Sequence, residues 1–107
     1  MMAERNMAAK LAGSDTQVTD GARWTLSGPL TFADAGTLLE ATRTLALPAS
    51  GTVDCSGIGA VDSAAVAVLL ALKRRASAEG RPLAFAGIPA QLVLLADLYD
   101  VRELLAA

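Results

Sequence analysis

The feature that most constrains this chain is a run of nine consecutive apolar residues at 64–72. Asp62 and Ser63 precede the run and are residue types that cap helix N-termini, whereas Gly80 is typical of a helix end. The sequence therefore predicts a helix over residues 63–79. The run is too short to span a membrane, which takes roughly 18 apolar residues. A helix on a sheet needs an apolar stripe only about 100° wide, so other helices of the chain or a partner protein must cover its remaining sides.

Short strand and helix patterns alternate along the rest of the chain. Residues 17–19 and 23–27 alternate between apolar and polar side chains, and Asp20-Gly21 between them favours a tight hairpin turn. Thr31, with Asp34 three residues on, predicts the start of a helix, which Pro48 ends. Further strands are predicted over 52–55 and 82–86, helices over 89–99 and 101–105, and a linker over 56–61.

This order, β-β-α-β-α-β-α, predicts an α/β fold with a small mixed sheet. The later strands should run parallel, joined by right-handed crossovers, with the helices packed on one face of the sheet. With 107 residues, the chain is long enough for one core. We expect a flexible tail over residues 1–13 and a single domain over 14–107. A hydrophobic content of 53% excludes a disordered chain.

The composition argues against an enzyme. The chain contains no histidine that could activate Ser63, and no glycine-rich phosphate loop. Its single cysteine, Cys55, is expected to be a buried, inert thiol. We expect no metal or cofactor site.

The charges argue against binding to nucleic acid. The net charge is −2, and residues 73–75 (Lys-Arg-Arg) form the only cationic cluster in the sequence. A nucleic-acid-binding protein needs a broader positive face. We expect this cluster to be a solvated flank of its helix.

Three segments resemble sequence motifs of STAS domains. Residues 54–63 (DCSGIGAVDS) resemble the signature D-[LF]-S-x-V-x-x-[VIM]-D-[ST], with cysteine in the place of Leu or Phe. Residues 26–30 (LSGPL) resemble the motif L-x-G-x-[LI] at the end of the second strand. Residues 96–101 (ADLYDV) look like the L-x-x-L-Y-x-[LV] ending of MlaB-type STAS proteins.

The resemblance implies a STAS fold and a non-enzymatic accessory subunit. Such a subunit binds the cytoplasmic ATPase of an ABC transporter for phospholipid trafficking, and through it a membrane permease. It would be cytoplasmic, peripheral to the inner membrane through its partner, with no membrane insertion of its own. The resemblance places Asp62 and Ser63 at the ATPase contact.

Further contact residues are predicted from their positions on the helices. Ala64, Ala65 and Val68 are predicted from the apolar run, and Phe32 and Leu39 from their placement on the preceding helix. Ser63 is expected both to cap its own helix and to touch the partner.

Two other functions remain open from the sequence. The chain could be an anti-sigma-factor antagonist switched by phosphorylation of Ser63, because a phosphate adds about two negative charges to the contact. Antagonists typically follow the Asp-Ser pair with Ser and Gly, whereas Ala64 and Ala65 follow it here. A third possibility is a lipid- or nucleotide-binding module.

Overall fold

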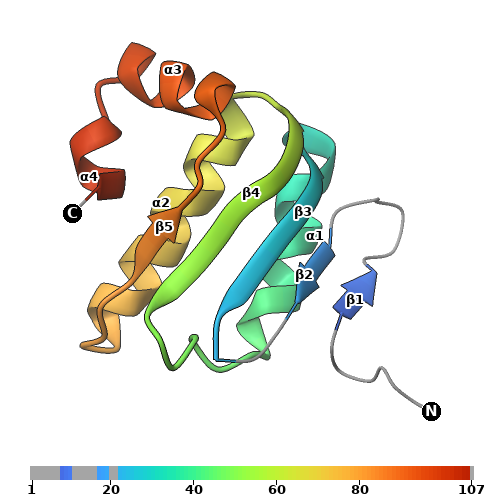
Figure 1. The fold of residues 1–107 in the computed structure, drawn as a ribbon, viewed down its shortest axis with the longest axis vertical. Helices are drawn as coiled ribbons and strands as arrows, with labels where there is room; N and C mark the ends of the chain where they lie inside the picture. Colours follow the sequence, from blue (N-terminus) through green and yellow to red (C-terminus); the bar gives the residue numbers. More distant parts are fainter. Residues whose placement is uncertain (1–7, 11–16, 20–21, 107) are drawn as a thin grey trace.

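The fold is a five-stranded mixed sheet with helices packed on one face, as Figure 1 shows. The computed structural model describes residues 8–10, 17–19 and 22–106. The strands lie side by side in chain order; β1, β2 and β3 pair antiparallel, and β3, β4 and β5 pair parallel. The elements are β1 (Ala8–Lys10), β2 (Gln17–Thr19), β3 (Trp24–Leu30), α1 (Phe32–Arg43), β4 (Thr52–Val61), α2 (Ser63–Ala78), β5 (Ala84–Ala86), α3 (Ala90–Leu98) and α4 (Arg102–Ala106). The predicted α/β class is confirmed.

The predicted hairpin is confirmed by the pairing of β2 with β3, in which Val18 lies opposite Leu26. Trp24 and Leu26 are fully buried under the helices, whereas Thr25 and Ser27, which alternate with them, are partly exposed. The predicted turn at Asp20-Gly21 lies outside the described residues. So does most of the predicted tail, of which residues 8–10 form β1 beside β2.

The predicted linker over residues 56–61 is wrong, because β4 continues through it to Val61. Its backbone pairs with β3 along this stretch, where Gly57 lies opposite Ser27 and Val61 opposite Leu30. A Cβ added at Gly57 would lie 3.0 Å from the Ser27 Cβ. The glycine therefore allows a close approach of two strands rather than marking a loop.

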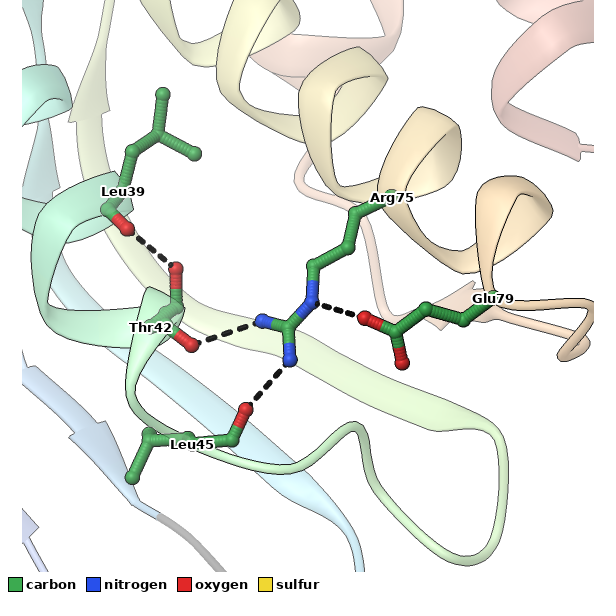
Figure 2. Close-up of polar contacts among 5 residues, drawn as sticks. All are labelled: Leu39, Thr42, Leu45, Arg75 and Glu79. Carbon is green, nitrogen blue, oxygen red and sulfur yellow. Dashed lines mark hydrogen bonds and ion pairs between the residues drawn. The ribbon is translucent and has the colours of Figure 1, made fainter.

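Helix α1 ends at Arg43, earlier than Pro48 suggests, and Arg75 of α2 caps its C-terminal end. Figure 2 shows the Arg75 guanidinium donating to the carbonyl oxygens of Thr42 at 2.8 Å and Leu45 at 2.6 Å. Its Nε donates to the Glu79 carboxylate at 2.9 Å. The Thr42 carbonyl also accepts a hydrogen bond from the Leu45 amide at 3.0 Å, and Leu45 lies just beyond the helix. Arg75 therefore adds charged donors at the C-terminal end of α1 and stabilises it.

The cationic cluster is therefore not simply a solvated flank. Lys73 also turns back onto the chain, because its Nζ donates to the carbonyl oxygen of Leu83 at 2.6 Å. Arg74 between them is exposed. Among the described residues, no helix is both long and apolar enough to cross a membrane.

Candidate partner-binding site

The start of α2 lies at the edge of the sheet where the parallel strands end. Strands β3, β4 and β5 are parallel, and α1, α2 and α3 follow them in turn. The N-terminal ends of these three helices therefore gather at one edge, toward the top of Figure 1. Surfaces outside the carboxyl ends of parallel strands are common binding sites in such sheets.

Asp62 joins two of these helix starts. Its Oδ1 accepts a hydrogen bond from the Ala64 amide at 2.8 Å, which caps α2. Its Oδ2 accepts a hydrogen bond from the Phe32 amide at 2.9 Å, at the first residue of α1. One carboxylate thus satisfies a free N–H group of two helices and complements the positive end of both dipoles. Asp62 is therefore a positioning residue for the site.

Ser63 is the first residue of α2, and its side chain is exposed. The expectation that Ser63 caps its own helix is wrong, because Asp62 occupies the cap position. In the part of the chain that the structure describes, the Ser63 hydroxyl has no hydrogen-bond partner. It therefore remains available to a partner protein or a modifying enzyme.

Two of the predicted contact residues point into the core. Ala65 and Val68 are fully buried, so they stabilise the domain and lie too deep to touch a partner. Ala64 is half-buried, and Ala67 is exposed beside Ser63. Helices α1, α3 and α4 all contact α2, so the chain's own helices cover most of the apolar run.

The two predicted residues of α1 differ in exposure. Phe32 is 85% exposed, and its backbone amide is held by Asp62. This bond places the backbone of Phe32 next to Asp62, the residue that precedes Ser63. Leu39 is half-buried and packs against the core, so it contributes less free surface than Phe32.

Helix α3 and Tyr99, which follows it, carry exposed apolar side chains that the sequence patterns did not predict as contact residues. Leu94, Leu98 and Tyr99 are 65%, 73% and 50% exposed. Together with Ser63 they line a hollow of about 640 Å³. The sequence could have predicted these residues, because α3 (AQLVLLADL), like the start of α2, is apolar on nearly every side. The same reasoning applied to α3 predicts an exposed apolar face.

Two hollows that share Ser63 and Tyr99 join the exposed residues of α2 and α3, and Phe32 lies next to them through its amide bond to Asp62. We call these residues together the Ser63 patch. It consists of Phe32, Ser63, Ala67, Leu94, Leu98 and Tyr99. All six side chains are uncharged, and the neighbouring Asp62 carboxylate is bonded to two backbone amides. Exposed apolar groups gathered at one edge are typical of a protein-binding surface.

Cys55 offers no chemistry at this edge. The side chain is fully buried in β4. Burial raises the pKa of its thiol to about 12, with a smaller contribution from the Asp54 charge. The thiol stays protonated near neutral pH, and a protonated, buried thiol is a poor nucleophile.

Comparison with known families covers nearly the whole chain. The family model described as "Mlab, STAS domain" matches residues 15–106, a stretch that contains every residue of the Ser63 patch. None of the curated proteins matches the sequence of the chain.

Proposed function

This chain belongs to the STAS family, in its MlaB-type branch, and on that premise we propose that it binds the cytoplasmic ATPase of an ABC transporter for phospholipid trafficking. STAS domains are generally non-catalytic accessory or regulatory domains. The proposed role is to support the assembly and activity of the transporter. The protein would then be cytoplasmic and peripheral to the inner membrane, held there through the ATPase and its permease.

The observation that carries this proposal is the exposed, uncharged Ser63 patch. It combines aromatic and leucine side chains from α1 and α3 with the small residues of α2. Large apolar side chains are typical of the centre of a protein interface, and the small residues beside them let a partner chain approach closely. Asp62 holds the starts of α1 and α2 together, so this part of the surface is preorganised before a partner binds.

The test is co-purification with the ATPase from native membranes, comparing the wild-type chain with Ser63→Arg. An arginine here would place an unpaired charge in an apolar contact, which costs about 3 kcal/mol or more. That cost corresponds to a loss of affinity of roughly 100-fold. The variant should remain folded, because Ser63 is exposed and its hydroxyl bonds to none of the described residues.

The matched control is Ala78→Arg, which adds the same side chain to the last residue of α2, also exposed. Position 78 lies about 22 Å along the helix from Ser63, outside the Ser63 patch. Co-purification should persist with this control. Equal recovery of the ATPase with Ser63→Arg and Ala78→Arg would remove Ser63 from the contact.

The exposed hydroxyl of Ser63 also favours a second candidate, an anti-sigma-factor antagonist switched by phosphorylation. A phosphate on the first residue of α2 would lie at the positive end of the helix dipole. Incubation with an anti-sigma kinase and ATP, followed by intact mass measurement, tests this alternative. An unchanged mass after incubation would exclude that kinase as the switch.

A further inference from the structure

One face of α2 remains accessible along the full length of the helix. Ser63, Ala67, Leu70, Arg74 and Ser77 follow one another at alternating spacings of four and three residues, and all but the half-buried Leu70 are exposed. This spacing keeps side chains on one side of a helix, as in the contact seam between two paired helices. The stripe extends over about 21 Å, well beyond the Ser63 patch.

A groove flanks each half of this stripe. The first, of about 280 Å³, lies beside Ser63 and Ala67 and reaches Leu70. The second, of about 490 Å³, begins at Leu70 and continues past Arg74 toward β5 and α4. Leu70 lines both grooves, so they meet at this residue of α2.

The second groove has an apolar floor and a cationic rim. The buried Leu83 contributes to the floor, and Leu104, which is 58% exposed, also lines the groove. Lys73, Arg74 and Arg81 line the rim, and among the described residues that line this groove none is acidic. This concentration of positive charge contrasts with the net charge of −2 of the whole chain.

Arg74 is the most available of the three cations. It is exposed and has no ion-pair or hydrogen-bond partner within the described part of the chain. Lys73 donates to the Leu83 carbonyl. Within the described ranges, Arg81 makes only a long hydrogen bond of 3.4 Å to the Pro48 carbonyl. Three other arginines form ion pairs with carboxylates close to them in the sequence; these are Arg43, Arg75 and Arg102.

We propose that the partner element is an amphipathic helix that lies along the α2 stripe and places acidic side chains over the cationic rim. This inference rests on the proposed function, because it describes the ATPase segment that covers the Ser63 patch. Arg74 follows Ser63 by 11 residues, or about 16 Å along the helix axis. The acidic residues of the partner should therefore lie about three helical turns from its apolar contact with Ser63. Complementary charges at that distance fix the register of the two helices and speed their association.

The experiment measures the dissociation constant for the purified ATPase at low and high salt. Arg74→Glu should weaken binding roughly 10-fold at about 50 mM salt, and less at about 300 mM, because salt screens contacts at an interface rim. Arg74→Met should have a smaller effect, since it removes charge without reversing it. Arg23→Glu is the control, because Arg23 is exposed and precedes β3, at the opposite edge of the sheet from Ser63. It should change the constant by less than about twofold.

The outcomes separate this inference from the proposed function. If Ser63→Arg abolishes binding while Arg74→Glu behaves like Arg23→Glu, the acidic helix is wrong and the ATPase contact stands. If the wild-type chain does not bind the ATPase, both are wrong. The groove would instead be a lipid contact if Arg74→Glu leaves ATPase binding unchanged and reduces sedimentation with vesicles containing phosphatidylglycerol, and that result also overturns the inference.

Discussion

Replacing Asp62 by alanine should loosen the starts of two helices at once. The substitution removes the acceptor for the Ala64 amide at 2.8 Å and for the Phe32 amide at 2.9 Å. Loss of an N-cap costs about 1 kcal/mol. Loss of the second hydrogen bond, which links α1 to α2, costs roughly another 1 kcal/mol. The free energy of unfolding should therefore fall by about 2 kcal/mol, which for a domain of this size lowers Tm by roughly 8 °C.

A second variant, Asp62→Asn, separates the two contributions. Asparagine caps helices about as well as aspartate, but its amide group offers one acceptor oxygen instead of two. It should keep the bond to Ala64 and lose the bond to Phe32. We expect a loss of about 1 kcal/mol, half that of the alanine variant.

Thermal and urea unfolding followed by circular dichroism measures both losses. Asp97→Ala is the matched control, because Asp97 is 44% exposed and pairs at 3.2 Å with Arg102, which is 63% exposed. Such a surface pair should contribute less than about 1 kcal/mol. Hydrogen exchange at the Phe32 amide provides an independent reading. Equal losses for Asp62→Ala and Asp97→Ala, or unchanged exchange at Phe32 in Asp62→Ala, would refute the double-cap explanation.

Three further predictions concern the interior of the domain. Arg75→Met should lower the free energy of unfolding by about 2 kcal/mol, because it removes charged donors from the end of α1. The control Arg74→Met should change the free energy of unfolding little. Equal effects of the two variants in urea unfolding would contradict the role of Arg75 at the end of α1. Gly57→Ala should destabilise by roughly 1–3 kcal/mol, because its Cβ would crowd β3. Gly36→Ala meets open space in α1 and should stabilise by up to about 1 kcal/mol, so the same sign for both glycines would count against the packing argument. Because burial raises the pKa of the Cys55 thiol from 9.0 to about 12, folded protein at pH 9 should resist iodoacetamide and urea-unfolded protein should react. The unfolded thiol ionises first, so the free energy of unfolding should decrease as the pH rises from 9 toward 12; equal labelling of both states would show that the thiol is accessible.

Local sequence patterns predicted most of the elements. The alternation around Trp24 and Leu26 predicted a half-buried strand, and the residues flanking the apolar run predicted the start of α2 at Ser63. Both patterns express short-range physics: side chains alternate across a strand, and free amides at a helix start attract nearby oxygen atoms. The STAS resemblance, carried by residues 54–63, is confirmed by the family match.

Other features depended on residues far apart in the chain. Arg75 caps a helix that ends 32 residues before it, and Asp62 bonds to Phe32, 30 residues before it. The local sequence marks Asp62 as a helix cap but gives no sign of its bond to Phe32, and it does not distinguish Arg75 from a solvated charge. Glycines in residues 56–61 predicted a linker, whereas pairing with β3 makes the segment a strand.

The apolar run shows where sequence information ends. Its length and flanking residues were enough to predict a helix that must be covered on several sides. Periodicity identifies a buried face only when polar residues mark the other face, and no polar residue interrupts this run. The direction of each side chain was therefore set by the packing of α1, α3 and α4 around α2, which buried Ala65 and Val68 and left Ser63 and Ala67 exposed.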